Sequence, residues 1–429
     1  MNEEELVLHE NPNIEEAVDQ SWLLKLSGSF PAFQERNFRL FFWGQLISVC
    51  GTWLQTVALG WIVYQLTQSA FWVGAVAAIG VLPTLLFGLL GGALVDKFDR
   101  KMVLYVTQSI SMFLAFILGG LTVAGKINLF EICFFAFCFG TVNAIDLPAM
   151  QAFISEMVSK ERLASAIALN SALTNSARAI GPALAGILIN LIGAGWTFIF
   201  NALSFIAVLM AFAAMMIRSQ LPHHKHLHPL AMVREGLKYT FRDRSLSLFM
   251  VTASAVAICG YSYTAILPVI AVNVFHGGSD TLGYLLSATG VGALIGAIAV
   301  SAFSKRVSAK RFVIGGNFLL ALGLIIFSHT ADLYIALAAL FIVGFAFTFE
   351  FSMINTLIQH KVLPEMRGRV MSILILMFQG AAFLGNFGIG YFAEHLSPQF
   401  AIYMGGLGIL LTACCLYIYR DDISELQHR

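Results

Sequence analysis

Three ionisable residues lie inside long apolar stretches of the chain, at Asp146, Arg178 and Glu350. A charged side chain at the centre of a membrane helix costs roughly 2.5 to 3.5 kcal/mol on insertion scales, so such residues commonly mark routes for protons, ions or substrates. Burial disfavours the charged form of a carboxyl group, which lets a buried acid take up and release a proton. All three residues are therefore candidates for proton coupling. Glu350 comes first, because it has no cationic residue at helical spacing, and Asp146 second; alternatively, Asp146 and Arg178 neutralise one another between adjacent helices.

Polar side chains recur on one face of the first apolar segment, where Gln45, Ser48, Thr52 and Gln55 follow one another at three- and four-residue spacing. This spacing places them on one side of a helix, as expected for the wall of a wet cavity. Alternatively, such residues form hydrogen bonds between packed membrane helices. The full set of candidates for a substrate cavity is Gln45, Ser48, Thr52, Trp53, Gln55, Asn143, Asn170, Thr174, Tyr261, Tyr263, Asn355 and Gln379.

Enzyme motifs give little support to a catalytic function. The sequence lacks the Gly-x-Gly-Asp pattern of intramembrane aspartyl proteases, and no HExxH or GxSxG stands in a suitable context. The absence of GxxxxGK[ST] argues against a pump that hydrolyses ATP. An intramembrane enzyme that uses Asp146 and Glu350 as paired carboxylates remains the alternative from another class. We expect no enzyme, no cofactor and no metal, with the proton as the coupling ion.

Four histidines form the clearest cluster of possible metal ligands, at His223, His224, His226 and His228. Two of them would share a helical face, as in some transition-metal sites. Prolines flank the cluster on both sides, so a solvated linker is the favoured interpretation. The six cysteines all lie in apolar runs and are expected to be small packing residues.

The composition excludes a water-soluble protein. Of the 429 residues, 58% are hydrophobic and 11% are charged, and the mean hydropathy is +0.80. Apolar runs such as 102–124 are long enough to cross a hydrocarbon core of about 30 Å as helices. The first twenty residues contain seven acids and no Lys or Arg, which is unlike a signal peptide and predicts a cytosolic tail.

Apolar segments separated by Gly, Pro and charged residues predict an all-α integral membrane protein with about twelve transmembrane helices. Of the 25 Lys and Arg residues, only Lys126 falls in an outer turn of this arrangement and only Arg178 lies in the middle of a span. Cations gather on the cytoplasmic side of membrane proteins, so both termini are predicted to be cytoplasmic. The predicted spans are 38–66, 71–95, 102–124, 128–155, 162–192, 196–217, 245–274, 281–303, 312–328, 332–358, 368–395 and 400–419.

The two halves of the chain are weakly similar to one another. A shift of 204 residues lays the segment that begins at Gly140 over the one that begins at Gly344, and places Asp146 on Glu350. Repeated halves with a binding site at their interface are a recurring plan among secondary transporters. The predicted domains are a cytosolic tail at 1–36, a six-helix bundle at 37–217, a linker with an amphipathic helix at 218–244, a second six-helix bundle at 245–419 and a cytosolic tail at 420–429.

Two motifs resemble those of the major facilitator superfamily. The turn GGALVDKFDRK resembles the family's signature at Gly92, Asp96, Lys97, Arg100 and Lys101, with Asp99 in place of the usual second Gly. The segment NSARAIGPALAG resembles the motif of proton-coupled exporters at Gly181, Pro182 and Gly186. Together with NAIDLPAMQAF and RGRVMSI, these motifs make residues 36 to 419 similar to the branch of enterobactin exporters and macrolide efflux proteins. That branch often has Arg where this chain has Met150.

The resemblance implies a major facilitator fold of two pseudo-symmetric six-helix bundles that expose a central site to each side of the membrane in turn. It also implies proton-coupled export of a siderophore or similar amphipathic small molecule. Multidrug or macrolide efflux and lipid or lysolipid transport are the alternatives within that fold, and a passive channel is an alternative outside it. The expected location is the bacterial inner membrane, where the chain acts as a monomer on a small-molecule substrate and binds no nucleic acid.

Overall fold

The structure, a computed structural model, describes residues 30–217, 229–303 and 309–419. Within these ranges the chain is helical and contains no strand. Most of the predicted N-terminal tail, the four linker histidines and the predicted C-terminal tail lie outside the described residues. The all-α prediction is confirmed.

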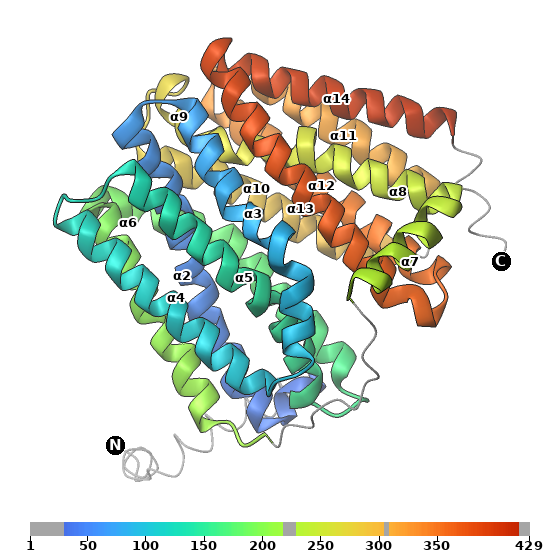
Figure 1. The fold of residues 1–429 in the computed structure, drawn as a ribbon. Coiled ribbons are helices and arrows are strands. Elements are labelled where there is room, and N and C mark those ends of the chain that lie inside the picture. The colour runs from blue at the N-terminus through green and yellow to red at the C-terminus, as the bar shows by residue number, and fades with distance from the viewer. Residues whose placement is uncertain (1–29, 218–228, 304–308, 420–429) are drawn as a thin grey trace, which may run out of the picture.

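The first half of the chain forms five long helices that lie side by side (Figure 1). They are α2 (Arg36–Thr67), α3 (Ala70–Val95), α4 (Arg100–Val123), α5 (Leu129–Met157) and α6 (Leu163–Ala214), preceded by a short 3-10 helix, η1 (Pro31–Gln34). Eleven helical stretches in the described residues are long and apolar enough to cross a membrane. The 52 residues of α6 are enough for two crossings of a core about 30 Å thick at about 1.5 Å per residue.

A backbone bend at Gly193 divides α6 into those two crossings. Its φ is +84° and its ψ is 162°, a conformation that glycine adopts readily because it has no Cβ. Counting α6 twice turns eleven spanning stretches into twelve crossings. The structure therefore contains the number of crossings that the apolar pattern predicts, and the break expected between 192 and 196 lies at Gly193.

The second half begins with α7 (Pro229–Arg242) and an irregular span. This span runs through α8 (Arg244–Ala255), a π turn η2 (Val256–Tyr261), a 3-10 turn η3 (Ser262–Ile266) and α9 (Leu267–Asn273). Pro268 lacks a backbone N–H, and the hydroxyl of Ser262 donates to the carbonyl oxygen of Ala257 at 2.8 Å. The remaining helices are α10 (Ser279–Phe303), α11 (Ala309–His329), α12 (Leu333–Lys361), α13 (Pro364–His395) and α14 (Pro398–Ile418).

Polar side chains fix where many of these helices begin. A side-chain oxygen at the N-cap accepts a hydrogen bond from a backbone N–H in the first turn, which would otherwise lack a partner within the helix. Asp99 does this for α4 by accepting from the N–H of Met102 at 2.9 Å. The residues with this capping bond are Ser69, Asp99, Asn128, Asp243, Asp332 and Ser397.

Two bundles of helices meet along a shared interface. The first consists of α2 to α6, and the second of α8 to α14 (Figure 1). Across the interface α3 packs against α13 and α6 packs against α10. At Gly186 the latter pair is so close that an added Cβ would lie 3.1 Å from the Cα of Gly283. Small residues permit this approach of two backbones.

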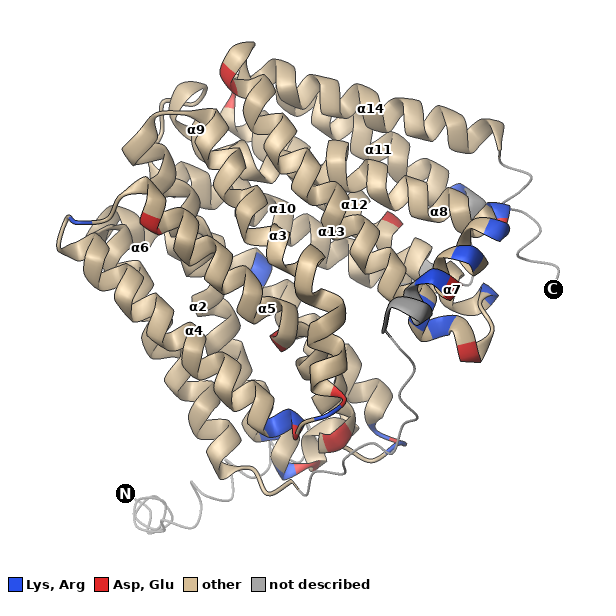
Figure 2. Cartoon of the chain, viewed as in Figure 1, with Lys and Arg blue, Asp and Glu red and all other residues tan. Residues whose placement is uncertain are grey.

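Charged side chains gather at one end of each bundle, as Figure 2 shows. We call this the charged end; it contains the turns that follow α3, α5 and α12. Here Arg100 pairs with Glu156 at 2.6 Å, and the Nζ of Lys101 donates to the carbonyl oxygen of Met215 at 2.8 Å. The opposite end contains the turns that follow α2, α4 and α13.

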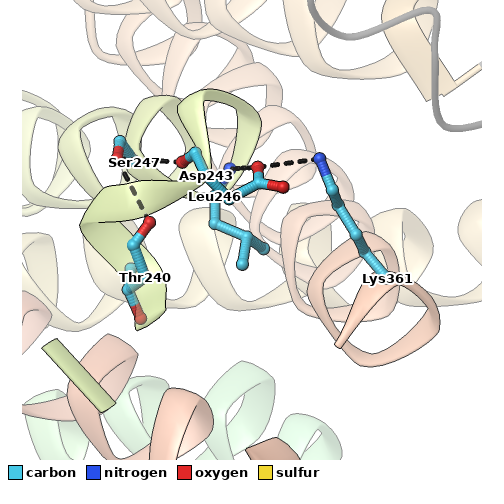
Figure 3. Close-up of polar contacts among 5 residues, drawn as sticks. All are labelled: Thr240, Asp243, Leu246, Ser247 and Lys361. Carbon is cyan, nitrogen blue, oxygen red and sulfur yellow. Dashed lines mark hydrogen bonds and ion pairs between the residues drawn. The ribbon is translucent and has the colours of Figure 1, made fainter. Parts of the chain in front are cut away.

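The linker segment expected to form an amphipathic helix is α7, which lies against the second bundle at the charged end. Glu235 pairs with Arg369 of α13 at 2.7 Å. At the corner between α7 and α8, Asp243 accepts hydrogen bonds from the N–H of Leu246 at 3.0 Å and from the Nζ of Lys361 at 2.7 Å (Figure 3). Partial burial acts to raise the pKa of Asp243, but these hydrogen bonds and the charge of Lys361 outweigh it and lower the pKa below its usual value of 3.8.

Candidate functional site

The guanidinium of Arg178 lies between the two bundles. Arg178 is on α6, midway between the start of that helix at Leu163 and the bend at Gly193. Its Cζ is 5.9 Å from the ring centroid of Tyr261 and 5.7 Å from that of Phe347. These rings belong to the second bundle, so a cation of one bundle rests on aromatic rings of the other, within the range of cation–π attraction.

The two rings beside Arg178 belong to a group of four aromatic residues of the second bundle that contact one another. We call them the central aromatic cluster: Tyr261, Phe347, Phe351 and Phe378. The rings of Tyr261 and Phe347 stack with centroids 5.3 Å apart, and those of Phe351 and Phe378 meet edge-on at 5.1 Å. Phe378 also lies 6.0 Å from Tyr261 and 6.3 Å from Phe347. Rings from η2, α12 and α13 thus form one apolar surface beside Arg178.

Sequence reasoning found Arg178 and Tyr261 but missed the three phenylalanines. Phe347 and Phe351 are four residues apart and therefore share a face of α12. Gln379, a predicted cavity residue, is the neighbour of Phe378 in the chain and is half-buried. A search for aromatic pairs at helical spacing near Glu350 would have found the pair on α12.

Asp146 bonds to α4 and not to Arg178. Its Oδ1 accepts from the hydroxyl of Thr107 at 2.5 Å, and the amide of Gln108 donates to Oδ1 at 3.0 Å and to Oδ2 at 3.1 Å. No ion pair between Asp146 and Arg178 is found among the described residues. The hypothesis that these two residues neutralise one another is therefore not supported by the geometry.

Glu350 is enclosed within the second bundle. It is 1% exposed, and its Oε1 accepts from the Nδ2 of Asn317 at 2.5 Å. Asn317, on α11, is fully buried. Among the described residues, two acceptors in this pair find no donor: the Oε2 of Glu350 and the Oδ1 of Asn317. A buried carboxyl group is thus held by a single neutral amide.

The two acids occupy similar places in the two halves. Asp146 and Glu350, which the internal repeat superimposes, each lie in the fourth span of a bundle. Each bonds to a polar side chain from the third span of the same bundle, with Thr107 and Gln108 on α4 and Asn317 on α11. Neither acid contacts the central aromatic cluster through a hydrogen bond in the described residues.

The polar face predicted for the first span divides between two surroundings. Gln55 is buried, and its Oε1 accepts from the Nδ2 of Asn201 of α6 at 2.7 Å. Ser48 is also buried, whereas Thr52 is exposed and Trp53 packs against Gly181. Gln55 therefore joins helices of one bundle, which is the alternative given for such residues, and the structure does not bring it to the aromatic cluster.

The other predicted cavity residues are scattered. Tyr263 is buried and its hydroxyl lies 3.2 Å from that of Thr289, so it belongs to the interior of the second bundle. Asn355 accepts from the Nε2 of Gln359 at 2.5 Å, within α12. Gln45, Asn143, Asn170 and Thr174 have partly or largely exposed side chains, although the Oε1 of Gln45 is buried without a partner in the described part of the chain.

The two family motifs lie at different positions along the molecule. Asp96 and Lys97 are exposed at the charged end, where the nearby Gly92 has open space around it. Gly181, Pro182 and Gly186 lie deeper, where α6 meets α2 and α10. The first motif thus lies at a turn and the second at a packing contact between bundles.

Hydrogen bonds at the opposite end join the two bundles. The hydroxyl of Tyr64 donates to the Oδ1 of Asn273 at 2.6 Å, and the hydroxyl of Ser279 donates to the carbonyl oxygen of Gly186 at 3.0 Å. The Oε2 of Glu394 accepts from three groups at the start of α3: the hydroxyl of Ser69 at 3.1 Å and the N–H groups of Ala70 at 2.7 Å and Phe71 at 3.3 Å. We call the contacts of Glu394 the Glu394 latch.

Comparison with known proteins places this geometry in a family. Residues 27–427 match the family described as transmembrane secretion effector, MFS_3. The chain belongs to this family. Three curated relatives are similar over most of their length. They are the staphyloferrin A transporter of Staphylococcus aureus (26% identical, 81% of this chain and 87% of that one), the multidrug efflux pump Tap of Mycobacterium tuberculosis (24%, 84% and 87%) and macrolide efflux protein A of Streptococcus pyogenes (20%, 91% and 98%).

Solved structures share the fold. A bacterial homolog of the human lysosomal transporter Spinster, in an inward-facing and unoccupied conformation, has a TM-score of 0.68 at 15% identity and covers 91% of this chain and 96% of its own. A D-xylose-proton symporter has a TM-score of 0.68 at 14% identity and covers 88% and 97%. The protein is thus a membrane transporter of the major facilitator superfamily and not an enzyme, as expected from its sequence.

Proposed function

We propose that this protein exports an amphipathic small molecule, of the siderophore class, from the bacterial cytoplasm in exchange for protons. The observation that carries the proposal is Glu350, a carboxyl group enclosed at membrane depth with one neutral amide as its partner. A carboxylate is stable there only with compensating donors, which a single N–H supplies poorly. One relative is named the staphyloferrin A transporter, and this name motivates the choice of a siderophore as the cargo.

A bound proton accounts for the two acceptors that lack donors. If the Oε2 of Glu350 carries a proton, it becomes a donor, and the Oδ1 of Asn317 is the adjacent acceptor that needs one. The acid and the amide then pair reciprocally, as two such groups do when both are neutral. Loss of the proton leaves a charge that favours a rearrangement of α11 against α12. Proton binding is thereby linked to the conformation of the second bundle.

The charged end is the cytoplasmic end in this proposal, because cations concentrate on that side of membrane proteins. Both termini are then cytoplasmic and the membrane is the inner one. The Glu394 latch and its neighbouring hydrogen bonds join the bundles at the outer end, and in the proposed cycle Arg178 faces the cytoplasm in this conformation. If the latch separates and the charged end closes, the same site becomes exposed to the outside, which is alternating access. In this proposal the monomer carries out the whole cycle.

Efflux of drugs such as macrolides is the second candidate. Two of the relatives are named as multidrug or macrolide efflux proteins. Four adjacent rings also offer an apolar surface that accepts ligands of several shapes. The two candidates share the transport cycle and differ in the cargo.

Transport in proteoliposomes with an imposed pH gradient tests the proposal. The parent protein is compared with Glu350→Gln and Asp146→Asn, with a carboxylate siderophore, a catecholate siderophore and a macrolide as cargoes. We expect the gradient to drive accumulation of a siderophore and Glu350→Gln to abolish that accumulation. Accumulation of the macrolide alone would favour the second candidate. Downhill movement alone, unaffected by either substitution, would refute proton coupling.

A further inference from the structure

Arg178 carries a charge at mid-span that the described residues do not neutralise. Arginine keeps its charge in proteins and presents a planar fork of N–H donors. The contacts found for its guanidinium are the faces of Tyr261 and Phe347. Arg178 is half-buried, and aromatic faces attract a cation but accept no strong hydrogen bonds, so its N–H donors can still bind an oxyanion.

The acids that could pair with Arg178 are engaged elsewhere. Asp146 is bonded to Thr107 and Gln108, and Glu350 is bonded to Asn317. The other Asp and Glu residues in the described part of the chain lie in the end turns of the spanning helices or outside them. The second bundle therefore presents rings to Arg178 and no carboxylate. A partner from outside the protein is the remaining source of negative charge.

We propose that Arg178 binds an oxyanion of the transported molecule, a carboxylate above all, while the apolar part of that molecule lies on the central aromatic cluster. This inference rests on the proposed transport function and names its substrate class, an amphipathic organic anion. The guanidinium fork matches the two oxygens of a carboxylate, and adjacent rings provide apolar contact. A neutral or cationic cargo would leave Arg178 without an anion.

The position of the site also explains how binding would act on the two bundles. The cation belongs to α6 of the first bundle, and the rings belong to η2, α12 and α13 of the second. An anion that pairs with Arg178 takes the place of the rings as the partner of the guanidinium. Substrate binding thus changes a contact between the bundles, as differential binding to two conformations requires.

A pair of probes that differ in charge but little in shape tests the inference. The full-length protein in nanodiscs of phosphatidylcholine is titrated with 1-naphthoate and with 1-naphthamide by calorimetry at pH 7. We expect the parent to bind the carboxylate at least about ten-fold more tightly than the amide. In Arg178→Gln the ratio of the two dissociation constants should fall to about one. In Arg178→Lys the ratio should be intermediate, because a lysine retains the charge but not the planar fork.

A matched control removes another arginine. Arg162→Gln breaks an ion pair with Glu35 at the charged end, where N and O are 2.8 Å apart, and should keep the preference for the carboxylate. Absence of a preference in the parent, or its survival in Arg178→Gln, overturns the inference. If the preference is lost when phosphatidylglycerol is added to the nanodiscs, the site binds a lipid headgroup, and the proposal of a soluble substrate is refuted.

Failure of this inference is distinguishable from failure of proton coupling. Glu350→Gln should retain the preference for the carboxylate while losing transport driven by a pH gradient. If Glu350→Gln transports like the parent and Arg178→Gln loses the preference, the anion site stands and proton coupling through Glu350 does not. If Glu350→Gln loses gradient-driven transport and Arg178→Gln keeps the preference, the reverse holds.

Discussion

Removal of the Glu394 latch should shift the protein toward a conformation open at the opposite end. The carboxylate of Glu394 accepts from the hydroxyl of Ser69 and from the backbone N–H groups of Ala70 and Phe71 at the start of α3. A carboxylate at a helix N-terminus contributes about 0.3 to 1 kcal/mol through the helix dipole. A hydrogen bond to a charged group contributes about 1.5 to 3 kcal/mol when it is buried, and less here because Glu394 is exposed.

We take about 1 to 2 kcal/mol for the latch as a whole, which corresponds to a change of roughly 5- to 30-fold in the ratio of the two conformations. Glu394→Ala should therefore increase the population with a separated opposite end by about that factor. Pulsed electron paramagnetic resonance measures the distance between spin labels at Gln68 and Leu396, which are both exposed at that end. This distance reports the separation of the two bundles there. The labels require a background in which the six free cysteines are replaced.

The control for this experiment is Glu131→Ala. Glu131 also lies at the opposite end and completes a capping box with Asn128, but both residues belong to the first bundle. Its removal should lower stability by about 1 kcal/mol without changing the separation of the bundles. An unchanged distance distribution in Glu394→Ala, or an equal shift in both variants, would show that the latch does not hold the bundles together.

Three further substitutions test the packing and the polar contacts. Gly186→Ala should cost about 1 to 3 kcal/mol and loosen α6 from α10, as seen in thermal melts, whereas Gly388→Ala, with open space around it, should be nearly neutral. Asp243→Ala should lower the free energy of unfolding by about 1 to 2 kcal/mol at pH 7, because the helix cap and the ion pair with Lys361 are lost. Folding lowers the pKa of Asp243, so its stabilising effect is complete above the unfolded value of 3.8 and disappears as the pH falls through the lowered value. The melting temperatures of parent and variant should therefore converge in acid. Gln55→Ala should cost about 1 to 3 kcal/mol by leaving the amide of Asn201 unpaired, and a double-mutant cycle with Asn201→Ala should show coupling between them.

Sequence alone predicts the number of crossings because the bilayer imposes one simple rule on every span. An apolar run of about twenty residues must be helical, since no water is present to bond an irregular backbone. The internal break in the seventh span does not follow from that rule. The π turn at Val256–Tyr261 and the 3-10 turn at Ser262–Ile266 lie where neighbouring helices surround the backbone, and composition carries no signal of such neighbours.

The candidate site was harder to predict, because the sequence shows which residues share a face of a helix but not which helix packs against that face. The spacing of Ser48, Thr52 and Gln55 predicts one polar face, but Thr52 is exposed while Gln55 meets Asn201 inside the bundle. Arg178 is conspicuous in an apolar run, whereas Phe347 looks like any other apolar residue of α12. Only the packing of α6 against the second bundle brings these two together.

The separation of the two acids from Arg178 shapes the mechanism. In the proposed cycle, proton binding at Glu350 and anion binding at Arg178 act on different contacts, so coupling between them requires an element that takes part in both. Helix α12 is that element, because it carries Glu350, which contacts Asn317 of α11, and Phe347, which contacts Arg178 of α6. The two residues are three positions apart and lie on neighbouring parts of the helix surface. A small rotation of α12 that follows loss of the proton would therefore move the ring of Phe347 against Arg178, which links the proton to the substrate through a single rigid helix.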